Sequence, residues 1–145
     1  MHGNPGAAPE RAAAMRAAIE RLYSARMAGD VEAVLAEVND DVHYAVMGQI
    51  AGQPLAPAIR GRIALRSYFK GLFERWLWDG MAVRTIIIGE ESAAVETGGA
   101  MIHTVSNQRF TTDVCAVLGF RDGKVSTIRE YCDSFTIVRI AGLAL

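Results

Sequence analysis

Apolar side chains recur at two different spacings along this chain, and the spacing changes near residue 80. Over residues 9–28, Met15, Ile19, Leu22 and Tyr23 stand three or four positions apart, which is the spacing of one helix face. Beyond residue 80 the apolar runs are rich in Val, Ile, Thr and aromatic residues, and short polar turns separate them. The pattern predicts a helical first half followed by a stranded second half.

Two more helices are predicted in the first half. Gly29 is a typical helix stop, and Asp30 is a typical N-cap residue for a second helix that ends near Asn39. The apolar stripe of this second helix consists of Val31, Val34, Leu35 and Val38. Gly61 opens the third helix, whose apolar stripe consists of Leu65, Tyr68, Phe69, Leu72, Phe73 and Trp76. Trp78 falls off that stripe, near the end of the helix.

The stretch between the second and third helices has two parts. Residues 42–47 predict a short strand in which Val42, Tyr44 and Val46 share one face, and His43 faces the other way. Residues 48–60 contain two glycines and two prolines and show no periodicity. An irregular segment of that length in a small domain is often a lid or a binding loop, so we expect one here.

The second half predicts strands over residues 81–90 and 93–105, followed by a long hairpin over residues 109–138. The pair Gly98-Gly99 inside a strand indicates a bulge or a close approach of another backbone. Asp122-Gly123 marks the turn of the hairpin. The turn could be a three-residue type with a bulge or a two-residue type, and the residues alone leave both open.

These elements predict an α+β fold in which three N-terminal helices cover one face of a strongly curved, mainly antiparallel sheet shaped like a cone. One domain is expected over residues 9–145, and residues 1–8 are expected to be a disordered tail. Residues 114–118 are apolar at every position, so both faces of that strand need a cover. A symmetric homodimer through the sheet is the simplest cover for the outer face.

Composition narrows the classes of partner. A formal net charge of -1 without a basic cluster argues against nucleic acid, and no apolar run reaches the ~20 residues of a membrane span. The N-terminus lacks an apolar core of the signal-peptide kind, so we expect a cytoplasmic protein. Cys115 and Cys132 fit neither turn geometry as a disulfide, so reduced core thiols are expected. The three histidines and two cysteines have no metal-ligand spacing, and no phosphate or dinucleotide motif occurs, so neither metal nor cofactor is expected.

Glu130 is the residue that conflicts most with its surroundings, because it interrupts an otherwise strand-like run. A buried, unpaired carboxylate costs several kcal/mol, in round terms, so it needs an arginine partner, a raised pKa or a function. Tyr44 and His103 are the other candidates for catalysis, against the simpler interpretation of a core tyrosine and a partly exposed strand-end histidine.

Three segments give the chain a resemblance to a known family. They are AGDVEAVLAEVNDDVHY, the Gly-Arg before the third helix, and FRDGKVSTIREYCD. From about residue 19 to 142 it resembles the SnoaL-like branch of the nuclear transport factor 2-like superfamily. That group includes polyketide cyclases, ketosteroid isomerases and limonene epoxide hydrolases. The resemblance implies a cone-shaped α+β barrel with a deep pocket, a homodimer through the sheet, and the three-residue form of the hairpin turn.

Carried over residue by residue, the resemblance places Glu130 at the catalytic Asp of the hydrolases and cyclases, and Tyr44 at a Tyr that holds water in the hydrolases. Other catalytic positions of these relatives hold apolar residues here: Val46, Gly99 and Met101 for the hydrolases, and Ala116 for the isomerases, whose Tyr falls one position from Tyr23. None of the three mechanisms is complete in this chain.

The sequence therefore predicts a small-molecule enzyme that performs cofactor-free acid/base chemistry on an apolar, oxygen-bearing metabolite. Glu130 would move the proton, and Tyr44 and His103 would orient the substrate oxygen. The expected substrate-binding residues are Val46, Met101, Ile128, Trp76, Tyr23, Gly99 and Ala116. The alternative is a non-catalytic dimer that binds a small molecule in the same pocket.

Overall fold

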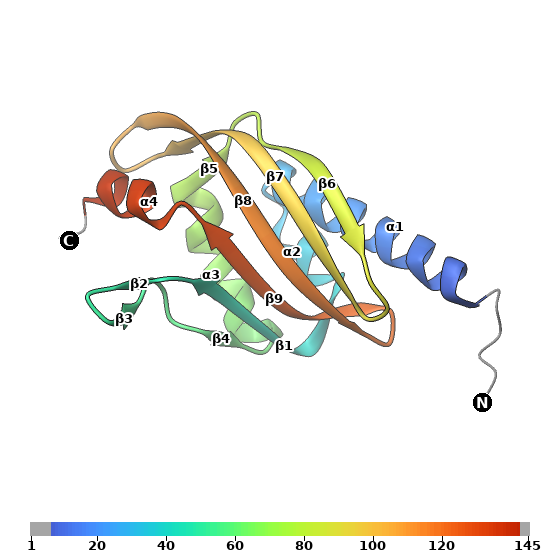
Figure 1. Cartoon of the computed structure of the whole chain (residues 1–145). Helices are drawn as coiled ribbons and strands as arrows, with labels where there is room; N and C mark the ends of the chain where they lie inside the picture. Colours follow the sequence, from blue (N-terminus) through green and yellow to red (C-terminus); the bar gives the residue numbers. More distant parts are fainter. Residues whose placement is uncertain (1–6, 143–145) are drawn as a thin grey trace.

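A computed structural model describes residues 7–142. Within this range the chain forms four helices (Figure 1). They are α1 (Ala7–Ala28), α2 (Val31–Leu35), α3 (Arg62–Arg75) and α4 (Ser134–Ala141). The N-cap predicted for α2 is confirmed, because Asp30 Oδ1 accepts the N–H of Ala33 at 3.0 Å. Of the predicted tail, Ala7 and Ala8 belong to α1, and residues 1–6 lie outside the described residues.

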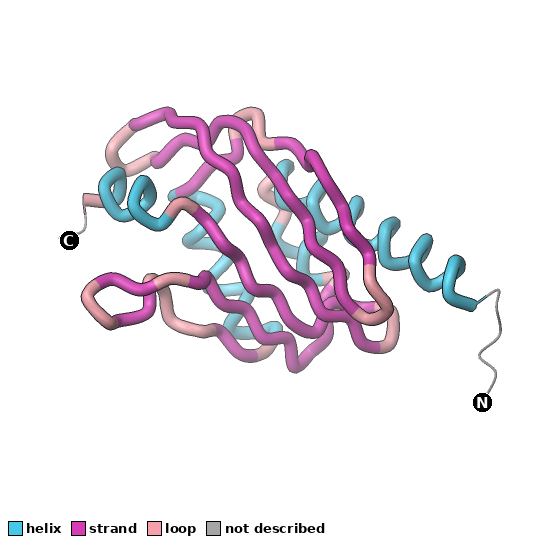
Figure 2. Tube along the Cα trace, viewed as in Figure 1, coloured by secondary structure: helices cyan, strands magenta, loops and turns pink. Residues whose placement is uncertain are grey.

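Seven strands form one sheet in the order β4-β1-β9-β8-β7-β5, and β6 also pairs with β7 (Figure 2). Their bounds are β1 (Val38–Met47), β4 (Ile59–Arg60), β5 (Trp76–Trp78), β6 (Ala82–Ile88), β7 (Ser92–His103), β8 (Gln108–Arg121) and β9 (Lys124–Cys132). The β1–β9 pairing is parallel, and the other pairings are antiparallel. The predicted α+β class and the helix-covered, curved sheet are confirmed, although the described sheet does not close into a barrel.

The core lies between the sheet and the helices α1, α2 and α3, which cover one face of the sheet (Figure 1). The apolar stripes predicted from periodicity supply it: Ile19, Leu35, Leu65 and Phe69 are at most 4% exposed. Leu118 and Val125 meet them from the sheet and are fully buried. Each such side chain stabilises the fold by ~1.5–3 kcal/mol relative to an exposed position, which is why the helices stay on this face.

The hairpin between β8 and β9 has a two-residue turn, so the three-residue turn expected from the resemblance is wrong. Asp122 and Gly123 both have positive φ (53° and 76°), and Arg121 pairs with Lys124. Phe120 then pairs with Val125, but Gly119 pairs with Thr127, so a bulge at this point adds one residue to β9. The bulge leaves Ile128 buried, and Glu130 faces the helices opposite Ala116.

The same register separates the two cysteines. Cys115 pairs with Tyr131, and Cys132 pairs with Val114, so the two sulfurs point to opposite faces of the sheet. Both are free, as expected, but they are half-buried rather than core residues, and Cys115 lies on the face that the helices do not cover.

Several element boundaries differ from the sequence prediction. α2 ends at Leu35 rather than near Asn39, because Val38 already pairs with Val125 in the sheet. Trp76, predicted on the stripe of α3, instead begins β5 and pairs with His103. The chain after Cys132 forms α4 instead of continuing the strand, because the Asp133 side chain accepts the N–H of Thr136 and starts a helix.

Residues 48–60 are also more regular than predicted. β2 (Gln49–Ile50) and β3 (Gln53–Pro54) form a small separate hairpin, and β4 pairs with β1. The segment after β3 nevertheless contributes to a pocket described below.

Gly98 and Gly99 lie where β7 stops pairing with β6 and starts pairing with β5. A Cβ on Gly99 would lie 2.1 Å from the carbonyl oxygen of Gly80, and its φ is 142°. A Cβ on Gly98 would lie 2.2 Å from the guanidinium carbon of Arg84. The predicted close backbone approach is therefore confirmed, and it lets the chain between β5 and β6 cross tightly over β7.

Candidate functional site

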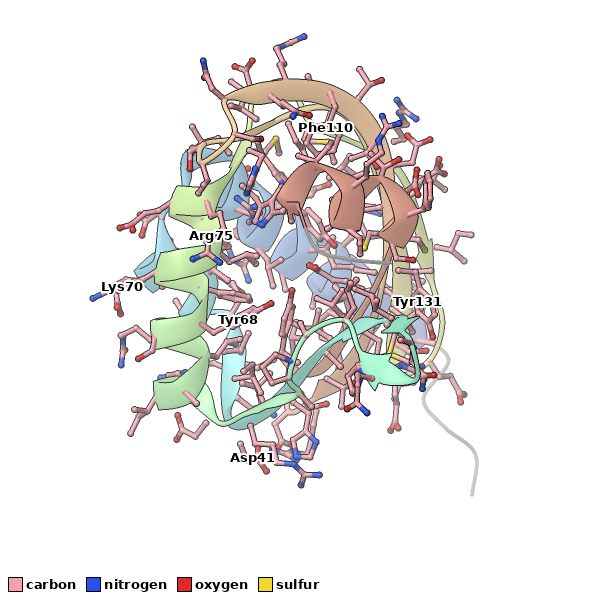
Figure 3. All side chains as sticks on the ribbon, turned by 90° about the vertical axis from the view of Figure 1, so that its left-hand side faces the viewer. Asp41, Tyr68, Lys70, Arg75, Phe110 and Tyr131 are labelled. Carbon is pink, nitrogen blue, oxygen red and sulfur yellow. The ribbon has the colours of Figure 1, made fainter. Side chains whose placement is uncertain are left out.

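A pocket of about 760 Å³ opens between α3, α4, the segment after β3 and the covered face of the sheet. Figure 3 looks into this end of the molecule, and Tyr68 points from α3 toward the opening. Aromatic and aliphatic side chains line most of it: Val46, Leu55, Tyr68, Phe69, Leu72, Phe73, Trp76, Trp78, Met101, Val105, Val114 and Ile137. A few polar groups converge on it, among them Arg26, Tyr44, Arg75, His103, Glu130 and Cys132. An apolar cavity with few polar groups is the usual form of a small-molecule site.

Glu130 and Tyr44 meet in the wall of this pocket. They stand on the neighbouring parallel strands β9 and β1, where Glu130 pairs with Val46 and Tyr44 pairs with Ile128. The Tyr44 hydroxyl donates to Glu130 Oε2 at 2.8 Å, which is the single hydrogen bond to this carboxylate among the described residues. The rings of Tyr68 and Phe69 pack on Tyr44 at centroid distances of 5.4 and 5.1 Å, which fixes its orientation.

The second oxygen of Glu130 remains open to the pocket. Glu130 Oε1 has no described hydrogen-bond partner. It is not fully buried either, because Arg62 Nε is the one fully buried polar atom without a partner among the described side chains. Oε1 therefore retains access to the cavity that Glu130 lines. Removal of water around the carboxylate raises the pKa of Glu130, and the Tyr44 hydroxyl and the charge of Arg26 partly oppose this rise. Burial, reinforced by the Glu130 charge, raises the pKa of Tyr44 well above its ordinary value, so Tyr44 acts as a hydrogen-bond donor.

Arg26, at the last turn of α1, reaches the same pocket. Its guanidinium lies 4.0 Å from the ring centroid of Phe73 and 4.3 Å from that of Trp78, and its Nη2 donates to the Trp76 carbonyl at 3.1 Å. Burial lowers the pKa of Arg26 to about 10, and the nearby Glu130 opposes that effect. At this value the guanidinium keeps its positive charge at neutral pH.

His103 lies in the pocket wall at the far end of β7, and it is 3% exposed. Its Nδ1 is 2.8 Å from Ser106 Oγ, and its ring centroid lies 4.3 Å from that of Trp76. Burial and the charge of Arg75 lower the pKa of His103, which favours the neutral imidazole. It stands eight positions along β7 from Val95, which pairs with Ala116, and Ala116 in turn pairs with Glu130. No described hydrogen bond links His103 to Glu130.

The predicted substrate-binding residues divide into two groups. Val46, Met101 and Trp76 line the pocket. The pocket lining leaves out Ile128, Tyr23, Gly99 and Ala116. Ile128, Tyr23 and Ala116 belong to the core behind the wall, where the Tyr23 ring stacks on Trp78 at 6.1 Å, and Gly99 serves the backbone crossing described above.

Arg26 and the α4 residues Ile137 and Ala141 are pocket residues that the sequence analysis missed. A signal for Arg26 was present, because it stands three positions after Tyr23 and four after Leu22, on the apolar stripe of the helix. A charged residue on such a stripe indicates a buried charge. For α4 the signal was Asp133, a typical N-cap residue, which the strand-like run before it obscured.

Two absences hold for residues 7–142. No three His, Cys, Asp or Glu side chains gather there as metal ligands would. Nor does any helix within that range have the length and apolar character to cross a membrane.

The family model of the SnoaL-like domain matches residues 19–128. No curated protein matches the chain. Among solved structures, an NTF2-like protein of unknown function from Burkholderia pseudomallei has a TM-score of 0.77 at 17% identity, covering 88% of this chain and 96% of its own.

Two further structures carry more specific names. An LEH-like epoxide hydrolase of M. tuberculosis has a TM-score of 0.65 at 22% identity, covering 88% of this chain and 87% of its own. A ketosteroid isomerase-like protein from Erwinia carotovora has a TM-score of 0.66 at 18% identity, covering 86% of this chain and 97% of its own. At these identities the likeness shows a shared fold.

Proposed function

This chain belongs to the SnoaL-like domain family, and on that premise we propose that it is a small-molecule enzyme of the cofactor-free acid/base kind. Its substrate is an apolar compound that carries an oxygen function. The observation that carries the proposal is the Glu130 carboxylate, held by Tyr44 at 2.8 Å with its other oxygen open to an apolar pocket of about 760 Å³.

Glu130 supplies the proton transfer. Its carboxylate takes a proton from a carbon next to a carbonyl group, and the electron pair of the broken C–H bond moves to the carbonyl oxygen. The protonated Glu130 then returns a proton to the same or another carbon, which gives exchange or isomerisation. Desolvation supports this role, because a carboxylate with a raised pKa is a stronger base than one in water.

Tyr44 positions Glu130 rather than the substrate, since its hydroxyl proton is already donated to Oε2. This refines the role expected for Tyr44 from the sequence. His103, at the other end of the cavity and paired with Ser106, is placed to meet a different part of a bound molecule. The aromatic side chains of the lining provide the shape that accepts an apolar ring.

The proposal is tested by hydrogen–deuterium exchange of a ring ketone. 2-Tetralone in deuterated buffer is followed by proton NMR, with and without the protein. The wild-type protein is expected to accelerate loss of the α-proton signal, and Glu130→Gln to reduce that acceleration by ~10²-fold or more, the range of general acid/base assistance. Glu96→Gln is the matched control, because Glu96 is exposed on β7 between the inward-facing Val95 and Thr97.

The control variant should accelerate deuterium exchange of the α-protons as much as the wild-type protein does. Binding of the ketone without any acceleration would count against catalysis and favour the alternative, a non-catalytic binding protein of the same fold. Equal acceleration by Glu130→Gln would remove Glu130 from the proposed role.

A further inference from the structure

Arg26 differs in its surroundings from the arginines that form ion pairs. The described ion pairs join Asp or Glu side chains to Arg21, Arg62, Arg66, Arg84, Arg109 and Arg121. Arg26 is more enclosed than most of these, yet no described carboxylate lies within 4.0 Å of its guanidinium. A buried cation without an anionic partner is costly unless something else compensates its charge.

The contacts of Arg26 hold it in place and leave donors free. A guanidinium has five N–H groups, and the described hydrogen bonds use Nη2 alone, toward the Trp76 carbonyl at 3.1 Å. The other two guanidinium nitrogens of Arg26 have no described partner, and neither is fully buried. They therefore keep access to the pocket that Arg26 lines. The Phe73 and Trp78 rings lie close to the guanidinium, so the group is pre-oriented.

The charge balance of the pocket points the same way. Two cations, Arg26 and Arg75, line it against one carboxylate, Glu130. Arg75 is exposed on α3 and labelled in Figure 3, so Arg26 is the cation that a ligand meets inside the cavity. His103 is neutral for the reasons given above, and the Cys132 thiol, whose pKa burial raises to about 11, adds no negative charge at neutral pH.

We infer that Arg26 recognises an anionic oxygen and that the ligand of this pocket is an apolar carboxylate. Its ring lies among the aromatic side chains, and its carboxylate takes the free N–H groups of Arg26. This inference rests on the proposed function in one respect, namely that the pocket holds an apolar, oxygen-bearing molecule. The bound carboxylate also compensates the charge that the protein itself leaves unpaired.

Binding of two nearly isosteric probes tests the inference. 2-Naphthoate is an anion and 2-naphthamide is neutral, and isothermal titration calorimetry measures the affinity of each. A hydrogen bond to a charged group contributes ~1.5–3 kcal/mol, so the wild-type protein is expected to bind the anion about ten-fold tighter or more. Arg26→Gln is expected to bind the two probes equally.

Arg21→Gln is the control, because Arg21 stands on the same helix, is paired with Glu37 and is exposed. It should keep the preference for the anion. Equal affinities of the wild-type protein for the two probes would overturn the inference, as would a preference retained by Arg26→Gln.

A second measurement covers the case in which Arg26→Gln does not fold. In nitrogen-labelled wild-type protein, the Arg26 Nε–H resonance, assigned with Arg26→Lys, should shift with 2-naphthoate and not with 2-naphthamide. An unmoved resonance at saturating 2-naphthoate would overturn the inference. Neither binding measurement needs turnover. If the protein fails to catalyse ketone exchange, the preference for the anion can still be tested. If the preference for the anion is absent, the result of the exchange experiment is unaffected.

Discussion

The surroundings of Glu130 make its carboxyl group a weaker acid than it is in water. Water is removed from around its carboxylate, and the two groups that oppose the effect, the Tyr44 hydroxyl and the Arg26 charge, do not cancel it, so its pKa lies above the ordinary 4.5. The folded protein therefore binds this proton more tightly than the unfolded chain does. The contribution to stability is fully present at low pH and is lost as pH rises through the folded pKa.

Glu130→Gln should accordingly keep or increase the free energy of unfolding near neutral pH, because a glutamine carbonyl still accepts from Tyr44 without carrying a charge. Urea unfolding of variant and wild type, below pH 4.5 and again near neutrality, measures the difference. The advantage of the variant should grow at the higher pH. A clear loss of stability near neutrality would mark Glu130 as the structural partner of Arg26.

At the residue scale, the sequence predicted the positions that strand alternation governs. The face of Tyr44 follows from period two, and Tyr44 reaches the pocket, whereas the face of Glu130 also depends on the bulge in the β8–β9 hairpin. Their mutual hydrogen bond did not follow, because it depends on a parallel pairing between strands that are far apart in the chain. Arg26 was missed because an arginine was read as polar surface, although its helical spacing places it with Leu22 and Tyr23.

At the scale of elements, the crossing at Gly99 is the most tightly constrained point of the sheet. A methyl group there would meet the Gly80 carbonyl at 2.1 Å, and a φ of 142° disfavours any residue with a Cβ. Gly99→Ala should lower the free energy of unfolding by ~2–5 kcal/mol, from backbone strain and overpacking together. Chemical denaturation of the purified variant measures it.

Gly71→Ala provides the contrast for that experiment. Gly71 lies inside α3, and a Cβ there would have no atom within 4 Å. Alanine is the better helix former, so this variant should gain ~0.5–1 kcal/mol. If Gly99→Ala were as stable as the wild type, the close approach to Gly80 would not constrain this residue.

Local signals predicted several of the elements that a local rule decides. The cap at Asp30 and the turn at Asp122-Gly123 are of that kind. The early end of α2 and the conversion of Trp76 into a strand residue are decided by pairing with β9 and β7, which no local signal reveals. The bulge after the turn also escaped prediction, although it sets the faces of β9: the register of Arg121 with Lys124, continued without it, would pair Glu130 with the outward-facing Cys115.

For the whole molecule, the outer face of the sheet raises the question of a partner. Cys115 and Val117 of β8 are half-buried on that face, and the neighbouring Tyr131 is 45% exposed. The helices cover the opposite face (Figure 1). We propose that a second copy of the chain covers this apolar strip, as the sequence led us to expect.

Sedimentation equilibrium at micromolar concentration should then give about twice the chain mass of 15.7 kDa. Val117→Lys places a charge in the strip and should give the mass of a single chain. Ile63→Lys, on the exposed side of α3 where Ile63 is 80% exposed, should leave the dimer intact. A monomeric wild-type protein would show that water covers this face.

The hydrogen bond between Tyr44 and Glu130 joins residues 86 positions apart, and this separation bears on the order in which the molecule folds. The β8–β9 hairpin closes through a two-residue turn, an event of microseconds in isolated hairpins. The parallel pairing of β1 with β9 must instead close a loop that contains α3 and most of the sheet, and the entropy of that closure is lost before its contacts form. Until β1 docks, Glu130 has no donor and the pocket lacks a wall. Ligand binding should therefore return with the slow phase of refolding, after the hairpin and the helices have formed.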